Sequence, residues 1–443
     1  MTFARNMPPR MKPIAARKSA ILSVLDVGTS KIVCLVARLM PMEASDILPG
    51  RTHRCRVLGI GHQRSRGIKA GAVVDMEAAE QAIRHAVDAA ERMAGVEVES
   101  VIVNVTGGRL ASQLYNAKIS IGGRTVSDGD IHRVLEAATA TKARQGRAVL
   151  HSLPTGCSLD GTRGILDPRG MIGDELGAEM NVISCEAAAA RNLMLAIERC
   201  HLKIEVMVAT PYATGLSVLV DDEAELGAAL VDMGGGTTSV GVFVDGRLMH
   251  VDAVAVGGNH VTMDVARGLT TRVVDAERLK TLYGSCMTAA SDEREMIDVA
   301  RVGGDGDHDG DQPNHLPRSH LTRIIRPRVE EILELVRDRL KAAGYAAHAG
   351  RRLVLTGGAA QIAGVADLAR TIISQQVRIG RPLGIQGLPE SAKNPAFAAA
   401  VGLLVYPQVA GIEHYEPRRQ NIVGGGSGDG YIARVGRWLK ESF

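Results

Sequence analysis

The chain has 443 residues, enough for roughly two to four domains, and its 45% apolar and 23% charged residues suit a folded protein with a large core. Aromatic residues make up only 3%, and Lys plus Arg exceed Asp plus Glu by just 52 − 49 = 3, so neither base stacking nor a strong positive field indicates a nucleic-acid partner. The six cysteines lack zinc-like spacing, which favours a reducing compartment, and no apolar run approaches the roughly 18–20 residues of a membrane span.

The N-terminal residues 1–19 are basic and contain no acidic residue. The apolar stretch that follows is too short for the hydrophobic region of a secretory signal peptide and lacks a small-residue cleavage site. We therefore expect a disordered basic arm on a protein that stays on the cytoplasmic side of the membrane.

Residues 20–37 and 228–244 share one design, in which two β-rich apolar runs flank a turn that follows an aspartate. Aligning them superposes residues 25–30 (LDVGTS) on residues 231–236 (VDMGGG). A Gly-rich turn between two strands is weak evidence alone. Its recurrence with the aspartate in register predicts a duplicated α/β unit.

Between the two hairpins, periodicity predicts helices at 77–93 and 185–200 and a strand at 100–105. Residues 106–184 break this rhythm and predict an inserted subdomain, Gly-rich, with one helix around 130–142. Its short β-like stretches are 118–121, 148–152 and 181–184.

The second half contains a low-complexity stretch, residues 303–317, before the longest expected helix, 321–343. Its alternating Asp and Gly imitate the first half of an EF-hand loop, but Leu316 stands where the bidentate glutamate belongs, so we expect a solvated, disordered loop. The other elements expected in this half are helices near 261–269 and 275–283 and a strand at 352–355.

Each Asp-hairpin has the features of a phosphate- and metal-binding loop. Gly-rich turns expose backbone N–H groups to an anion, and a carboxylate at the strand end can hold a hydrated Mg²⁺. Two such loops facing each other would clamp the β- and γ-phosphates of a nucleotide; the chain has neither a Walker motif nor a strand–GxGxxG–helix. The alternative is two ordinary β-hairpins with Asx-stabilised turns. The candidate residues are Asp26, Gly28, Thr29 and Ser30 in the first loop and Asp232, Gly234, Gly235, Gly236, Thr237 and Thr238 in the second.

Two weaker candidates lie downstream. Gly357 and Gly358 follow an expected strand and would let a base or ribose approach the backbone, although glycines are common at such turns. Glu277 and Lys280, three residues apart on an expected helix, can face one ligand; the alternative is an exposed surface pair.

The C-terminal residues 431–443 lie beyond a flexible glycine-rich linker, 424–430, and include the only tryptophan of the chain. On a helix their apolar side chains fall in an arc of roughly 140°, with the charged side chains on the other side, a pattern typical of a membrane-interface helix. The alternative is docking on a protein groove, against which the linker argues. Such a helix is only ~20 Å long, so lasting attachment needs several copies and suggests self-assembly. The expected lipid contacts are Ile432, Arg434, Val435, Arg437, Trp438, Leu439, Lys440 and Phe443.

Two Asp-hairpins, a connecting helix and a late Thr-Gly-Gly turn together resemble the actin, Hsp70 and sugar-kinase superfamily, and within it the FtsA family of bacterial cell-division proteins. Residues 26–31 and 232–238 look like the two phosphate loops of that family, and 356–359 like its adenosine motif. Further similar segments are 103–108, 151–154 and 164–168 in the insertion, and 256–259, 276–280, 326–328, 377–382 and 394–397 after it. The resemblance extends the expected ATP contacts to Lys31, Gly257, Gly258, Glu277 and Lys280.

The resemblance implies an α/β, actin/Hsp70-like duplicated ATPase fold with an inserted subdomain and a C-terminal amphipathic helix. It implies a protein that binds ATP and Mg²⁺, polymerises at the division septum on the inner face of the cytoplasmic membrane, anchors the FtsZ ring and recruits later septal proteins. Anionic lipid would hold the terminal helix. Asp26 and Asp232 would manage Mg²⁺ and water, with Glu186 the candidate general base of a slow hydrolysis. The C-terminal peptide of FtsZ would contact Arg328.

The expected division of the chain follows the same resemblance. Its parts are a basic arm (1–19), a first actin-like subdomain (20–105 and 185–215), the insertion (106–184), a second actin-like subdomain (216–267 and 352–406), the FtsZ-binding subdomain (268–351), a linker (407–430) and the membrane helix (431–443).

Three other functions share this fold. A pilus- or secretion-type actin homologue would act as a cytoplasmic scaffold and would not need a tethered membrane helix. A small-molecule kinase would need an acceptor pocket, for which the sequence has no signature. A chaperone-like ATPase would carry a substrate-binding domain after residue 406, where none is evident.

Overall fold

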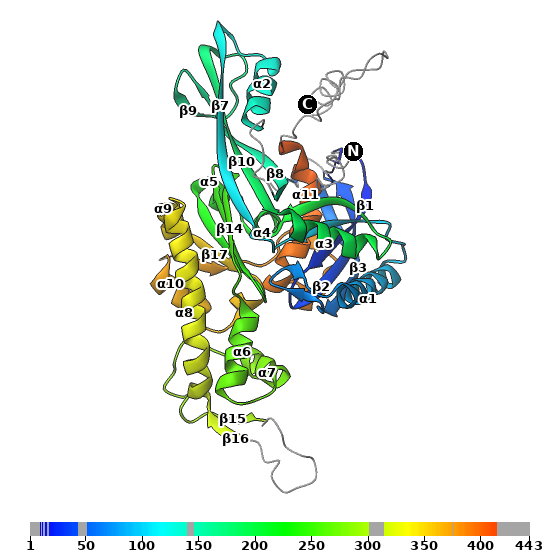
Figure 1. Ribbon diagram of the computed structural model, residues 1–443, viewed down its shortest axis with the longest axis vertical. Coiled ribbons are helices and arrows are strands. Elements are labelled where there is room, and N and C mark those ends of the chain that lie inside the picture. Colours follow the sequence, from blue (N-terminus) through cyan, green and yellow to red (C-terminus); the bar gives the residue numbers. More distant parts are fainter. Residues whose placement is uncertain are drawn as a thin grey trace.

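The computed structural model describes residues 9, 11, 14–15, 17–42, 51–139, 146–300, 314–374 and 376–413. Two central sheets organise this part of the chain (Figure 1). The first contains β1 (Ala20–Val27), β2 (Lys31–Pro41), β3 (His53–Arg64), β6 (Ser100–Val105), β11 (Lys203–Ala209) and β19 (Ile385–Gln386). The second contains β12 (Ala228–Met233), β13 (Thr238–Val244), β14 (Arg247–Val254), β17 (Leu353–Thr356) and β18 (Val377–Ile379).

The two sheets repeat one topology. The first runs β11-β6-β1-β2-β3, with β19 added at its edge, and the second runs β18-β17-β12-β13-β14. In each, a central strand pairs antiparallel with the next strand of the chain and parallel with a later one. The repetition confirms the duplicated α/β unit that the two hairpins predicted.

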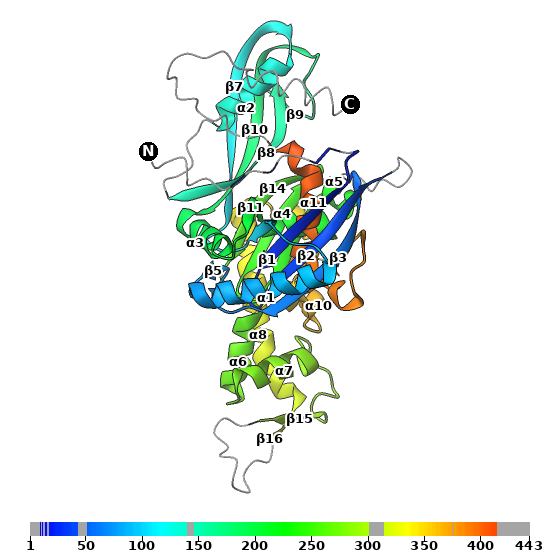
Figure 2. The same ribbon diagram turned by 90° about the vertical axis from the view of Figure 1, so that its right-hand side faces the viewer.

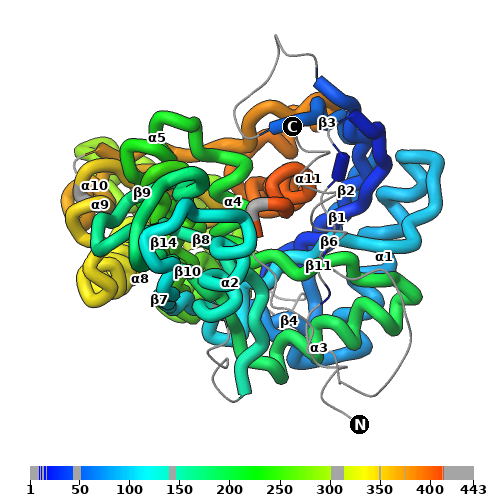
Figure 3. Tube along the Cα trace, turned by 90° about the horizontal axis from the view of Figure 1, so that it is seen from above, coloured from blue at the N-terminus to red at the C-terminus, as the bar shows by residue number. Residues whose placement is uncertain are grey.

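Helices pack closely against the sheets and against each other, with glycines at the contact points. α1 (Met76–Ala94) crosses the first sheet, where a Cβ on Gly61 would lie only 1.7 Å from the carbonyl oxygen of Ala86. α4 (Thr210–Val218) and α11 (Ala398–Val409) pack side by side between the sheets (Figure 3), and a Cβ on Gly402 would lie 1.7 Å from the carbonyl of Ala213. Glycine is required at such contacts. The remaining elements of this region are β4 (Ile68–Lys69), β5 (Ala72–Val73), α3 (Ala187–Glu198) and α5 (Asp221–Leu226).

The insertion forms a third sheet that projects from one end of the molecule (Figure 2). Its order is β7-β10-β8-β9, and the buried side of α2 packs on it around a small core of its own. The elements are β7 (Ala111–Thr125), α2 (Asp128–Thr139), β8 (Arg147–Leu159), β9 (Thr162–Ile165) and β10 (Ile172–Glu186). The predicted β-like stretches are therefore parts of much longer strands, and β10 continues to Glu186, so the helix predicted from residue 185 begins at Ala187.

Helices dominate the opposite end, around the second apolar core. They are α6 (Gly258–Gly268), α7 (Val273–Tyr283), α8 (Arg318–Ala342), α9 (Ala346–Arg351) and α10 (Val365–Ile372), with the hairpin of β15 (Met296–Val299) and β16 (Asn314–Pro317). The expectation of a loop through residue 317 is wrong at its end, because 314–317 pair with 296–299 and α8 begins at Arg318.

α11 continues past residue 406 to Val409, and a 3-10 turn follows at Ala410–Ile412. The expected linker (407–430) is therefore helical at its start. Its residues from 414 on, the expected membrane helix (431–443) and residues 303–313 of the low-complexity stretch lie outside the described residues. Among the described helices, none is both long and apolar enough to cross a membrane.

Candidate functional site

The two Asp-hairpins have the same turn. In the first, the amide of Gly28 donates to the carbonyl of Lys31 at 3.0 Å; in the second, Gly234 donates to Thr237 at 2.9 Å. Asp26 and Asp232 each lie two residues before the glycine, and each is paired in register with the second strand of its hairpin. The residues that the sequence alignment placed together therefore occupy equivalent backbone positions in the two hairpins.

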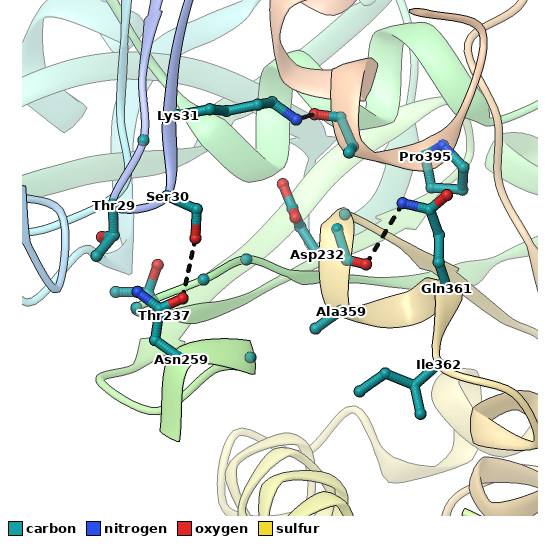
Figure 4. Close-up of a pocket in the computed structure, with 18 of the residues that line it drawn as sticks. Thr29, Ser30, Lys31, Asp232, Thr237, Asn259, Ala359, Gln361, Ile362 and Pro395 are labelled. Atoms are coloured by element: carbon teal, nitrogen blue, oxygen red, sulfur yellow. Dashed lines mark hydrogen bonds between the residues drawn. The ribbon is translucent and has the colours of Figure 1, made fainter. Parts of the chain in front are cut away.

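The turns face each other and touch. A Cβ on Gly235 would lie 2.0 Å from Ser30 Oγ, and a Cβ on Gly236 would lie 2.5 Å from Thr29 Oγ1. The hydroxyl of Ser30 also donates to Asn259 Oδ1 at 3.0 Å, across the cleft (Figure 4). The two turns can approach this closely only because the second consists of glycines, which leave room for the hydroxyl-bearing side chains of the first.

Both aspartates are buried at the floor of the cleft, with 6% and 8% of their surface exposed. Burial raises the pKa of Asp26 to about 6, an effect that Lys31 and a hydrogen bond from Asn104 reduce. Burial and the nearby Asp26 raise the pKa of Asp232 to about 7. Because the two neighbouring carboxylates resist ionisation, a bound cation would stabilise their charged forms.

Asn104 holds Asp26 in place. Its Nδ2 donates to Asp26 Oδ1 at 2.6 Å, and its Oδ1 accepts from the amide of Val27 at 2.8 Å, which fixes the amide orientation. Asn104 comes from β6, the parallel neighbour of β1. Sequence reasoning missed it because it lies 78 residues from Asp26 and belongs to an ordinary buried strand.

Lys31 supplies the positive charge of the first loop. Its Nζ donates to the carbonyl of Ala396 and lies 4.3 Å from the ring centre of Phe397, so the side chain spans the cleft (Figure 4). Burial lowers its pKa, while Asp26 and Asp232 raise it.

The opposite wall combines the later candidates. Gly357 has φ +88°, and a Cβ there would lie 2.3 Å from Asp232 Oδ1, so only glycine lets β17 end against this carboxylate. Lys280 Nζ donates to Glu277 Oε2 at 2.7 Å and to the carbonyl of Gly258 at 3.2 Å. Glu277 and Lys280 thus form an ion pair, and both also line the cleft.

The cleft encloses about 590 Å³, and most of the predicted residues line it. They are Asp26, Gly28, Thr29, Ser30, Lys31, Asp232, Gly234, Gly235, Gly236, Thr237, Gly258, Glu277, Lys280, Gly357 and Gly358. Thr238 and Gly257 stand behind it: the Thr238 hydroxyl donates to the carbonyl of Val256, and a Cβ on Gly257 would lie 2.5 Å from the carbonyl of Gly234. Asn259, from the segment 256–259 that the resemblance included, also lines the cleft, and lining residues that the sequence did not single out include Asn104, Thr106, Thr210 and Gln361.

Two predicted residues are elsewhere. Glu186 is not among the residues that line the cleft. Its Oε1 lies 3.3 Å from Arg109 Nε, so the two side chains form an ion pair. Arg328, on α8, is paired with Asp264 and Glu331 outside the cleft.

Two family models match the chain. The model for cell division protein FtsA matches residues 229–402, and the model for the SHS2 domain inserted in FtsA matches residues 107–184. The chain is 55% identical, over 98% of both chains, to the cell division protein FtsA of Agrobacterium fabrum. It belongs to the FtsA family of cell division proteins. The FtsA protein of Rhizobium meliloti is 54% identical, over 98% of this chain and 98% of its own. That of Escherichia coli K12 is 33% identical, over 97% of this chain and 100% of its own.

Solved structures confirm the actin-like fold. A PilM–PilN type IV pilus biogenesis complex matches with a TM-score of 0.59 and 14% identity, over 88% of this chain and 98% of its own. MreB5 of Spiroplasma citri, bound to AMPPNP, matches with a TM-score of 0.50 and 14% identity, over 87% and 95%. These likenesses concern the fold alone, so the pilus match does not favour the pilus-type scaffold over the FtsA family.

Proposed function

We propose that this FtsA-family chain binds ATP with Mg²⁺ in the cleft, polymerises on the inner face of the cytoplasmic membrane and anchors the FtsZ ring there. The observation that carries the nucleotide site is the pair of matched Asp-hairpins that face each other across the cleft. Two ordinary hairpins would have no reason to meet turn to turn over two buried carboxylates.

The residues fit a nucleotide and a hydrated Mg²⁺. The volume of about 590 Å³ lies within the range of small-molecule sites. The turns offer backbone N–H groups to phosphates without obstructing side chains, and the flexible Lys31 can add its charge. When bound, Mg²⁺ would neutralise phosphate charge. Asp26 and Asp232 would accept hydrogen bonds from its water ligands.

The nucleoside end would lie against the opposite wall. Gly357 and Gly358 leave the backbone accessible to a flat base or a ribose, and Glu277 and Lys280 supply polar contacts beside them. Gly257 supports this wall from behind rather than contacting a ligand. We assign no general base, because Glu186 is paired with Arg109 outside the lining residues, and slow hydrolysis stays a prediction.

Residues 431–443 would hold the protein on anionic lipid, and polymerisation would make this attachment lasting. The helical end around α8 would bind the C-terminal peptide of FtsZ. Arg328 is 28% exposed and already paired with two carboxylates, so a carboxylate of the bound peptide would take the place of one of them. Later septal proteins would join the same assembly.

The direct test of the nucleotide site is Asp232→Asn, with affinity for fluorescent ATP measured in the presence and absence of Mg²⁺. The variant should lose the Mg²⁺-dependent part of binding, by a factor of about ten to a hundred for one charge-assisted interaction. A matched control is Asp245→Asn in the β13–β14 turn of the same sheet, at φ +51°, where asparagine is well tolerated. Wild-type Mg²⁺-ATP affinity in Asp232→Asn would overturn the assignment.

A further inference from the structure

An exposed row of side chains crosses the first sheet. In the antiparallel register, Ile21 of β1 lies opposite Arg38 of β2, and Arg38 lies opposite Arg56 of β3. Opposite residues project from the same face, as does Arg54, two positions before Arg56. All four are exposed, Ile21 at 49%. We call these four residues the arginine row.

The row lies where α1 no longer covers the sheet. Val36 lies two positions before Arg38 and opposite Gly59, where a Cβ would lie 2.2 Å from the α1 carbonyl of Ala90. The same face is therefore buried under α1 at Val36 and open at Arg38. Figure 2 shows α1 crossing in front of the sheet and the strands continuing beyond it.

The arrangement is unfavourable in the free protein. Like charges directly opposite each other destabilise a sheet. Neither Arg38 nor Arg56 forms an ion pair or a hydrogen bond through its side chain with any residue in the described part of the chain. An isoleucine half exposed beside them adds an apolar contact to the charge. An external anionic surface with an apolar interior would satisfy both.

The row is close to the end of α11, the last α-helix of the described residues before 414–443. Gln408, near the end of α11, accepts through Oε1 from the amides of Thr52 and His53 at 2.9 and 3.0 Å. These two residues lead directly into Arg54. Lys18, at the end of the N-terminal basic segment, lies there too, since His53 Nε2 donates to its carbonyl at 3.0 Å. The end of α11, Lys18 and the row are therefore neighbours.

We propose that the arginine row is a second membrane contact, which lies on the anionic phospholipid headgroups of the bilayer that the tail enters. Guanidinium groups bind phosphate in a bidentate manner, and Ile21 would rest at the headgroup level. This inference rests on the proposed membrane attachment through residues 431–443. A helix on a flexible linker leaves the body free to turn, whereas a second contact fixes which face of the ATPase lies on the membrane.

The test is vesicle flotation of the full chain, with phosphatidylcholine vesicles that contain increasing fractions of phosphatidylglycerol. The double variant Arg38→Gln/Arg56→Gln is compared with wild type and with Arg267→Gln/Arg294→Gln. The latter removes two exposed arginines at the helical end of the molecule and so the same charge. At about fivefold per arginine near an anionic surface, the row variant should bind roughly 25-fold more weakly and with a shallower salt dependence. The control pair should bind like wild type.

The outcomes separate the two proposals. If wild type floats, a chain ending at Gly430 does not, and the row variant binds 25-fold more weakly, both contacts stand. If wild type and the row variant float equally at every phosphatidylglycerol fraction, the row is merely solvated and this inference is overturned, while the tail stays the anchor. If wild type does not float, the proposed attachment and the inference fail together. Because Arg38→Gln also removes a like-charge pair, an unchanged or raised melting temperature verifies that the variant folds.

Discussion

The two phosphate-loop candidates share a backbone but not a chemistry. The first turn carries Thr29, Ser30 and Lys31, and its aspartate is held by Asn104. The second turn carries three glycines and Thr237, and against its aspartate lies the backbone of Gly357. The first loop therefore contributes charge and hydroxyl donors, and the second contributes space. The two hairpins have the same turn, and the turns can approach each other closely because their side chains differ.

The largest effect should come from filling that space. A Cβ on Gly236 would lie 2.5–2.9 Å from three atoms of Thr29, so Gly236→Ala would push the two loops apart. The donors to the phosphates would then be misplaced, and we expect ATP affinity to fall about a hundredfold or more, which corresponds to the loss of one or two charge-assisted hydrogen bonds. Fluorescent-nucleotide titration measures the loss.

Two further variants make this result specific. Gly156→Ala is the control, because a Cβ there meets nothing within 4 Å. Adding Thr29→Gly to Gly236→Ala removes the opposing side chain and should restore part of the affinity. A Gly236→Ala protein that binds ATP like wild type would mean that the loops do not close on the phosphates.

The next effect should come from the charge of the first loop. Lys31→Met keeps the aliphatic stem but removes the ammonium group, which lies over the Phe397 ring. Losing one charge-assisted hydrogen bond to phosphate lowers affinity about 10- to 100-fold. Thr237 is the equivalent position in the second loop, and Thr237→Ala should cost only a few-fold, because a neutral hydroxyl is lost. Equal losses at the two positions would contradict the division of roles between the loops.

Much of this site could be predicted because its signal is local. An aspartate two residues before a Gly-rich turn identifies each loop without knowledge of the fold, and the repetition predicts that the loops pair. Asn104 and Thr210 carry no such signal, since they reach the cleft only because β6 lies next to β1 and α4 follows β11. Their roles depend on tertiary neighbours, which a single sequence does not reveal.

The insertion was located by its break in rhythm, yet the lengths of its strands could not be predicted. β7 spans 15 residues, and between Gln113 and Ser120 only partly buried positions alternate with exposed ones, so no long run of strongly apolar residues marks it. The boundary between β10 and α3, at Glu186, could not be predicted from the sequence either. Glu186 precedes a helix-forming run, so it looks like a helix start, but pairing of β10 with β8 as far as Arg147 keeps it in the strand.

The smallest expected effect is the pH dependence of stability and of nucleotide affinity, which the two aspartates determine. Both pKa values are raised from 3.8, to about 6 for Asp26 and about 7 for Asp232, so the folded protein binds these protons more tightly than the unfolded chain. The stability of the nucleotide-free protein should therefore fall as pH rises from about 4 to 7. In the proposed site Mg²⁺-ATP would require the ionised carboxylates, so its affinity should change in the opposite direction and rise several-fold from pH 6 to 8. The two opposed slopes distinguish a metal site from a structural pair of acids.

The comparison sharpens when one aspartate is made permanently neutral. Asp232→Asn mimics the protonated form, so it should unfold at a higher temperature than wild type at pH 8, and this advantage should vanish near pH 4. Asp26→Asn should gain less, because its carboxylate is already stabilised by Asn104 and Lys31. Thermal unfolding of the three proteins at both pH values measures the difference. If Asp26→Asn gained as much as Asp232→Asn, the hydrogen bond from Asn104 would not set the first loop apart.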